Sequence, residues 1–125
     1  MVSTVLMVAA GGATGAMARY GVGLFMAQTV AASLPLGVIA VNILGSFVMG
    51  AFASFAATRD MLHLSPLVMT GFLGGFTTFS AFSLEAVTLF EKGQINHALL
   101  YVALSVLGSI GALILAAIMA RMIWA

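Results

Sequence analysis

The sequence contains no cysteine and very few charged side chains. Only four Lys or Arg and three Asp or Glu occur among 125 residues, so 6% of the chain is charged. Soluble domains carry about 25% charged residues. Without cysteine the chain cannot form disulfides, thiolate metal sites or thiol nucleophiles. The formal net charge of +1 provides no cluster of cations for a nucleic-acid partner. We expect the two histidines, His63 and His97, in loops, which leaves no ligand set for a metal enzyme.

Apolar residues take the place of the missing charges. They make up 63% of the chain, and the mean hydropathy is +1.24. A membrane-crossing helix needs about 20 consecutive apolar residues. Four runs meet this length, at residues 4–26, 36–57, 67–90 and 98–123. The sequence therefore predicts an all-α membrane protein in which residues 1–125 form a single integral membrane domain of four transmembrane helices.

The few positive charges barely define an orientation in the membrane. Four spans place both termini and the second loop on one side, with Arg59 and Arg121, while Lys92 lies on the other. One interpretation is a weak bias toward a single orientation. The other is insertion in both orientations, which would allow an antiparallel dimer. Glycines spaced along the first, second and fourth runs favour close helix packing, so we expect a homo-oligomer.

The third run contains an unusual segment, TGFLGGFTTFSAFSLE, at Thr70–Glu85. Each glycine of the Gly74-Gly75 pair costs about 1 kcal/mol in a helix, and the hydroxyl side chains that follow compete for backbone hydrogen bonds. We expect the third helix to be broken near its middle. Irregular backbone at that depth persists only when buried in protein or facing water, and its free carbonyls bind cations in transporters. The alternative is a continuous helix whose hydroxyls bond to the preceding turn.

Two phenylalanines, Phe79 and Phe82, follow this segment and share one face if the helix resumes. Phenylalanine in a membrane helix is usually a packing or lipid-facing residue. The edge of an aromatic ring is, however, electropositive. The two rings could therefore face an anion without binding it as tightly as a full charge would.

Polar residues form modest stripes on two other runs. Asn42 and Ser46 are four residues apart on the second, and Tyr101, Ser105 and Ser109 follow steps of four on the fourth. Such residues either join helices by hydrogen bonds or offer donors to a small anion.

Ionisable residues are scarce within these runs. Arg19 and Glu85, with the phenol of Tyr101, are the only candidates for the proton relay that a proton-coupled pump requires. The inventory therefore favours a passive route for a small anion.

Three stretches carry a family resemblance. GGATGAMARY (Gly11–Tyr20), PLGVIAVNILGSFVMG (Pro35–Gly50) and GFLGGFTTFSAFS (Gly71–Ser83) closely resemble the signature segments of the Fluc/CrcB fluoride channels. The resemblance extends over essentially the whole chain, in order. One departure is Ala81, where many members have threonine, and it removes one hydroxyl from the expected anion path.

The resemblance implies an assembly and a function. Members of this family are dual-topology, antiparallel homodimers with two pores in the bacterial plasma (inner) membrane. They export cytoplasmic fluoride passively, down its electrochemical gradient, and so protect the cell from fluoride toxicity. The implied partners are the fluoride ion, a second copy of the chain and the lipid bilayer. No enzymatic activity is implied.

The resemblance also assigns roles to residues. Phe79 and Phe82 would line the fluoride path, one of them contributed across the dimer interface, and Asn42 would be the pore asparagine. Backbone carbonyls of Gly74 and Thr77 would hold a structural sodium ion (Na+) at the dimer interface. The remaining assigned positions are Ser80, Ser105, Ser109 and Tyr101 along the fluoride pathway, and Arg19 and Glu85 in vestibule or structural positions.

Two rival functions remain open from the sequence. A small dual-topology proton-coupled exporter also has four helices per chain, but it needs a membrane-embedded carboxylate, and the first run has none. A non-conducting membrane subunit would use the same polar stripes only as contacts between helices.

Overall fold

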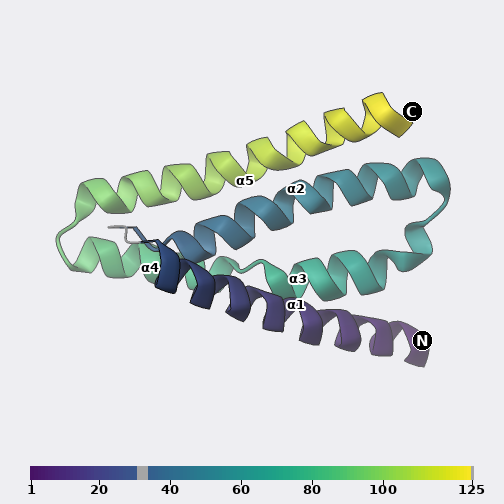
Figure 1. The fold of residues 1–125 in the computed structure, drawn as a ribbon, viewed down its shortest axis with the longest axis horizontal. Helices are drawn as coiled ribbons and strands as arrows, with labels where there is room; N and C mark the ends of the chain where they lie inside the picture. Colours follow the sequence, from purple (N-terminus) through teal and green to yellow (C-terminus); the bar gives the residue numbers. More distant parts are fainter. Residues whose placement is uncertain (31–33, 125) are drawn as a thin grey trace.

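A computed structural model describes residues 1–30 and 34–124, which form long helices lying side by side along one axis (Figure 1). In chain order the elements are α1 (Val2–Thr29), α2 (Leu36–Arg59), the 3-10 helix η1 (Leu62–Leu64), the π-helix η2 (Pro66–Leu73), α3 (Gly74–Phe76), α4 (Phe79–Glu91) and α5 (Ile95–Trp124). The chain is thus all-helical, as expected. Part of the polar connection between the first two helices, residues 31–33, lies outside the described residues.

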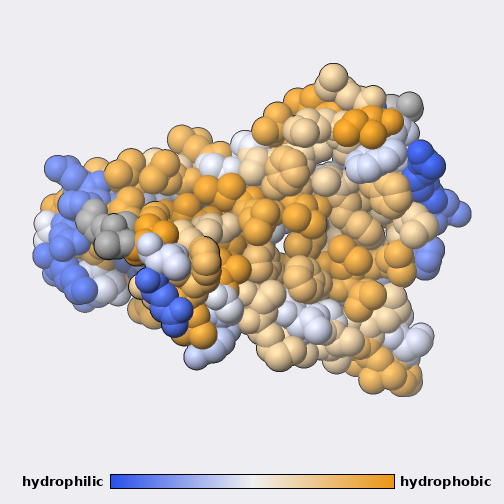
Figure 2. All heavy atoms as spheres, in the orientation of Figure 1, coloured by the Kyte–Doolittle hydropathy of each residue, from blue (hydrophilic) through white to orange (hydrophobic). Residues whose placement is uncertain are grey.

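Three helical segments are long and apolar enough to cross a membrane. They are Leu36–Arg59, Leu62–Glu91 and Ile95–Trp124. α1, with 28 residues, is long enough, but it is less apolar because it contains Arg19 and several glycines. The fourth crossing therefore stays a prediction. In Figure 2, apolar side chains cover the middle of the visible face and hydrophilic ones gather at its two ends, as a multi-pass membrane protein requires.

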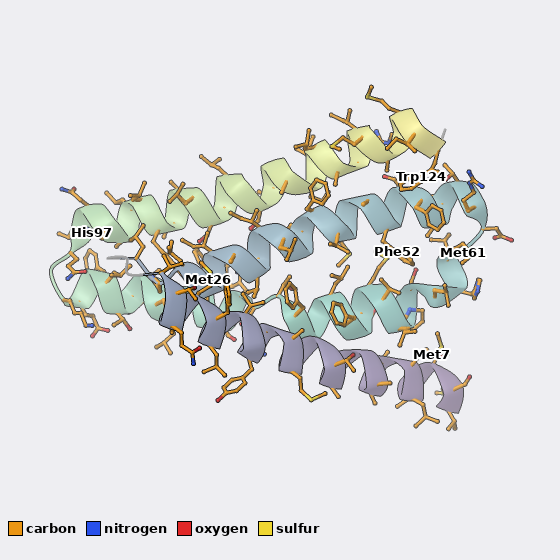
Figure 3. All side chains as sticks on the ribbon, viewed as in Figure 1. Met7, Met26, Phe52, Met61, His97 and Trp124 are labelled. Atoms are coloured by element: carbon orange, nitrogen blue, oxygen red, sulfur yellow. The ribbon has the colours of Figure 1, made fainter. Side chains whose placement is uncertain are left out.

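The helices pack in two pairs along the bundle. α1 lies against η2 and α3, while α2 lies along α5, and α4 contacts the first part of α5. α2 and α5 run in the same direction, and both chain termini lie at one end of the molecule (Figure 1). In Figure 3 His97 and Met26 lie toward the opposite end from Met61 and Trp124.

Glycines allow backbones to touch at both pairs. A Cβ atom on Gly75 would lie 2.6 Å from the carbonyl oxygen of Gly12. A Cβ atom on Gly50 would lie 3.1 Å from the Cα atom of Leu113 and still closer to its carbonyl oxygen. Real Cβ atoms do not approach backbone this closely, so neither position accepts a side chain without the helices moving apart.

The third helical segment departs from regular geometry in two ways. Pro66–Leu73 is a π-helix, a form that is rare beyond a single turn. Gly74 and Gly75, which the sequence suggested as the point of unwinding, are themselves helical. The extended residues are instead Thr77, with ψ 159°, and Thr78, with φ −153° and ψ 120°.

The connection between α4 and α5 is a tight turn. Gly93 adopts a left-handed conformation with φ 78°, and the N–H of Gln94 donates to the carbonyl of Leu89 at 3.0 Å. α5 begins at once, at Ile95, so the expectation that His97 lies in a loop is wrong. His63 lies in the short helix η1 between α2 and η2.

Replacing Gly50 by valine is expected to lower the melting temperature of the purified protein. The added side chain meets the Leu113 backbone, and overpacking of this kind costs about 1–3 kcal/mol. The fluorescence of the single tryptophan, Trp124, which packs on Phe55 with ring centroids 5.1 Å apart, reports the transition in detergent.

Gly111→Val is the matched control. Gly111 lies on α5, two residues before Leu113, and a Cβ atom there meets no atom within 4 Å among the described residues. Equal melting temperatures for the two variants would show that the contact at Gly50 contributes nothing to stability.

Candidate functional site

The side chain of Asn42 binds the extended backbone at Thr78 through two hydrogen bonds. Its Nδ2 donates to the Thr78 carbonyl at 3.0 Å, and the Thr78 N–H donates to its Oδ1 at 2.8 Å. The amide thus satisfies both backbone groups of a residue that has left the helix. Asn42 lies on α2, so this pair also joins α2 to the third helical segment.

Thr77 and Thr78 form an interruption between α3 and α4. Other side chains complete the hydrogen bonding around this interruption. The hydroxyl of Thr77 donates to the Leu73 carbonyl at 2.8 Å. The hydroxyl of Thr78 accepts from the Ala81 N–H at 3.2 Å and caps the N-terminus of α4. The carbonyl of Thr77 has no hydrogen-bond partner among the described residues.

Arg19 binds the interruption from α1. Its Nε donates to the carbonyl of Gly75 at 3.0 Å. Because α1 touches this segment through its backbone, the long arginine side chain reaches the carbonyl from the neighbouring turn. The contact occupies the Gly75 carbonyl and leaves the rest of the guanidinium free for other partners.

A cavity of about 370 Å³ lies between α2, α4 and α5, next to the interruption. The described residues that line it include no ionisable side chain. It brings together five of the residues that the sequence assigned to a fluoride path, namely Asn42, Phe79, Phe82, Ser105 and Ser109.

The two serines of this cavity have unpartnered hydroxyl groups. Ser105 is 4% exposed, and the Oγ atoms of Ser105 and Ser109 are both buried without a hydrogen-bond partner in the part of the chain that the structure describes. Serines within helices usually donate to the carbonyl four residues earlier, as Ser83 does to Phe79 at 3.0 Å. A buried unsatisfied hydroxyl costs about 1–3 kcal/mol. The two serines are therefore arranged for a partner inside the cavity.

The two phenylalanines contact each other but differ in exposure. Their ring centroids are 5.3 Å apart with an interplanar angle of 61°, an edge-to-face arrangement. Phe82 is 8% exposed, whereas Phe79 is 77% exposed. Phe82 also stacks on Tyr101, with centroids 5.5 Å apart at 20°. The orientation of the Phe82 ring is thus fixed within the chain, and that of Phe79 is open on one side.

Tyr101, which stacks on Phe82, is hydrogen-bonded to the partly buried Glu85. The Tyr101 hydroxyl donates to Oε2 of Glu85 at 2.6 Å, and Tyr101 is fully buried. Tyr101 is not among the described residues that line the 370 Å³ cavity. Ser80 is not among them either. It is exposed, and its hydroxyl lies 3.3 Å from that of Thr78.

A second and larger cavity, of about 730 Å³, adjoins the first along α2. On α2 the larger cavity is lined by Leu36, Gly37, Val38 and Val41, and the smaller one by Asn42, Gly45, Ser46 and Met49. Arg19, Glu85 and Thr78 line the larger cavity. Since Thr78 lines one cavity and Asn42 the other, their hydrogen-bonded pair lies between the two.

Two features of this site could not be read from the sequence. The backbone of Thr78 is the partner of Asn42, although 36 residues separate them. Met49 lines the smaller cavity, and nothing distinguishes it in sequence from the other apolar residues of α2. The hydroxyl-rich segment that contains Thr78 indicated an irregular backbone there. Nothing in the sequence indicated that Met49 lines the cavity.

Comparisons with known proteins agree with the resemblance noted in the sequence. A family model described as "CrcB-like protein, Camphor Resistance (CrcB)" matches residues 6–117. The "Fluoride-specific ion channel FluC" of Ruegeria sp. is 57% identical over 122 residues, covering 97% of this chain and 97% of that protein.

Two further relatives carry the same description. The protein from Roseobacter denitrificans is 56% identical over 105 residues, covering 82% of this chain and 83% of its own length. The protein from Jannaschia sp. is 59% identical over 97 residues, covering 78% of this chain and 92% of its own length. With a family model that spans most of the sequence and relatives of this similarity, the chain belongs to the CrcB family.

Proposed function

We propose that this chain is a fluoride-selective ion channel, not an enzyme, and that it lets cytoplasmic fluoride leave the cell down its electrochemical gradient. One observation carries the proposal: the buried hydroxyls of Ser105 and Ser109 have no hydrogen-bond partner among the described residues, and both serines line a cavity shared with Asn42 and Phe82. The relatives described above are named fluoride-specific ion channels. The chain is a multi-pass protein of the bacterial inner membrane, and export of fluoride there protects the cell from its toxicity.

The cavity offers neutral donors in place of water. The Asn42 amide has two N–H bonds and gives one to Thr78, so the second is left for an ion. The hydroxyls of Ser105 and Ser109 add two more donors, and the Phe82 ring adds an electropositive edge. Fluoride is small and strongly hydrated, so it enters only where such donors replace its water. With no full charge at the cavity, the ion is also released.

A second copy of the chain, inserted in the opposite orientation, completes the pore in this proposal. The exposed ring of Phe79 supports this arrangement, because it borders the cavity yet is 77% exposed in a single chain. The near balance of Arg59 and Arg121 against Lys92 supports dual topology. Each chain would cross the membrane four times, with α1 as the fourth span and the interruption at Thr77 and Thr78 near the midplane.

A sodium ion at the dimer interface fits the residues of the interruption. The Thr77 carbonyl has no partner among the described residues. Gly74, three residues earlier, is exposed, and the Gly75 carbonyl is occupied by Arg19. Carbonyls of unwound helices bind Na+ in transporters. Gly74 and Thr77 of both copies would hold the ion, which would offset the exposed carbonyl dipoles and favour a nearby anion.

The main rival, a proton-coupled exporter, is not favoured. Its carboxylate would have to be Glu85, which is hydrogen-bonded to Tyr101 and outside the cavity that holds the unpartnered hydroxyls. Relatives at this level of identity are named channels.

Purified protein in liposomes is expected to release trapped fluoride and retain trapped chloride. The reason is that the neutral donors replace the water shell of the smaller ion in a narrow cavity. A fluoride-sensitive electrode and a chloride electrode measure the two effluxes, and protein-free liposomes give the leak. Release of both ions at the same rate, or of neither, would refute the proposed function.

Phe82→Ile is expected to abolish fluoride efflux, because it removes the ring edge while keeping an apolar side chain of similar bulk. Size-exclusion chromatography checks that the oligomer persists. Phe90→Ile, on the same helix but 62% exposed and away from the cavity, is the control and should conduct as the wild type does. Normal conduction by both variants would show that the ring of Phe82 has no part in the path.

Dual topology is expected to place the C-terminus on both sides of the membrane, because the positive charges nearly balance. Fusions of alkaline phosphatase and of green fluorescent protein after Ala125 report the periplasmic and the cytoplasmic populations respectively. Adding two lysines to the turn at Gly93 should bias the population to one side. A fusion that is active on one side only in the unmodified chain would contradict the prediction.

A further inference from the structure

Ser46 on α2 is a hydroxyl-bearing residue of the smaller cavity to which the proposed path so far gives no role. It lines the cavity one helical turn after Asn42 and is half-buried. The side-chain hydrogen bonds made by the described residues of α2 involve Asn42 and Thr58, and the Ser46 hydroxyl makes none. The usual bond of a helical hydroxyl to the preceding turn, which Thr58 makes to the Ser54 carbonyl at 3.2 Å, is therefore not formed at Ser46. Its hydroxyl is available to a partner in the cavity.

The contact between α2 and α5 places Ser46 at the level of Ser109. The two helices run in the same direction (Figure 1), and a Cβ atom on Gly50 would lie 3.1 Å from the Leu113 Cα atom. Ser46 comes four residues before Gly50, and Ser109 comes four residues before Leu113. Four residues of either helix rise about 6 Å. The two serines therefore lie at the same level along the bundle, and both line the smaller cavity.

The helices stay adjacent through this part of the bundle. A Cβ atom on Gly108 would lie 2.8 Å from Cδ1 of Ile43, so α5 also packs on α2 before the contact at Gly50. Counting back another four residues places Asn42 level with Ser105.

The polar lining residues of α2 and α5 thus form two levels. Asn42 and Ser105 lie next to the interruption, since Asn42 binds the Thr78 backbone, and Ser46 and Ser109 lie one turn further along both helices.

We propose that the Ser46 hydroxyl donates a hydrogen bond to the anion at the level of Ser109. This inference rests on the proposed function, since it concerns the same path. An ion that leaves the level of Asn42 and Ser105 would then meet a second pair of donors, one from each helix. Without Ser46, the described residues by which α2 lines the cavity after Asn42 would be Gly45 and Met49, and neither side chain can donate a hydrogen bond.

An added hydroxyl helps fluoride more than a larger halide. The attraction between an anion and a donor increases as their separation falls, so the smallest halide gains most from each donor that replaces a water molecule. Because the hydroxyl is neutral, it supports entry of the ion without holding it as a lysine or arginine would. Ser46 is therefore a specificity-determining residue in this proposal.

Fluoride efflux from proteoliposomes tests the role of Ser46. Ser46→Ala is expected to slow fluoride release about tenfold, which corresponds to about 1.4 kcal/mol in a rate and matches the contribution of one hydrogen bond. Alanine is the best helix former, so the variant should fold, and size-exclusion chromatography checks that its oligomer persists. A rate equal to or above that of the wild type would overturn the proposal.

Two further variants separate hydrogen bonding from packing. Ser46→Cys keeps the shape of the side chain but offers only a weak donor, so it should be slow as well. Wild-type efflux by Ser46→Cys beside slow efflux by Ser46→Ala would assign the effect to packing and overturn the proposal. Ser54→Ala is the matched control and should conduct as the wild type does. Ser54 is also half-buried on α2, its hydroxyl makes no hydrogen bond among the described residues, and it lines neither of the two cavities.

The same measurement distinguishes failure of this inference from failure of the proposed function. Fluoride release by the wild type together with equal release by Ser46→Ala would leave the channel in place and remove Ser46 from its path. A wild type that releases no fluoride would refute the channel, and the role of Ser46 with it. Slow release by both Ser46→Ala and Ser54→Ala would show a general effect of losing a serine from α2 and would also overturn the proposal.

Discussion

The pairing of the Asn42 side chain with the Thr78 backbone is the interaction on which the rest of the site depends. An extended residue in a membrane helix leaves an N–H and a carbonyl without partners, and lipid supplies none. One side-chain amide satisfies both groups, at 2.8 and 3.0 Å. With these two bonds in place, α4 can begin at Phe79 under the cap of the Thr78 hydroxyl. The rings of Phe79 and Phe82 are then oriented by the start of α4.

The neighbouring helices hold the same interruption by close contact. Gly45 on α2 leaves room for the Thr77 side chain, since a Cβ atom at Gly45 would collide with its methyl group. Arg19 on α1 binds the Gly75 carbonyl just before the interruption. Gly45 on α2 and Arg19 on α1 thus both hold the backbone around Thr77 in place.

The sequence predicted the helical membrane character well, because long apolar runs with few charges are typical of membrane-spanning helices. The sequence also identified many of the residues of the candidate cavity. Asn42, Phe82 and Ser105 were singled out separately, and all three line one cavity. The sequence did not predict that the Gly74-Gly75 pair is helical, because the need for glycine at Gly75 comes from the approach of α1, a contact between distant parts of the chain. The π-helix and the partner of Asn42 depend on such long-range contacts too.

The charged side chains near the site lie at the larger cavity, whereas the described lining of the smaller cavity is neutral. This separation lets the smaller cavity bind an anion and still release it. The ionisable groups near the site, Arg19 and Glu85, line the larger cavity and are each tied by a hydrogen bond, to a backbone carbonyl and to Tyr101 respectively. Among the residues that the structure describes, the smaller cavity is lined by neutral donors only. Burying the hydroxyls of Ser105 and Ser109 without partners costs stability, and that cost is recovered only while an ion or water occupies the cavity. Neutral donors bind an ion less tightly than a full charge would, and a conducting path needs release as much as binding.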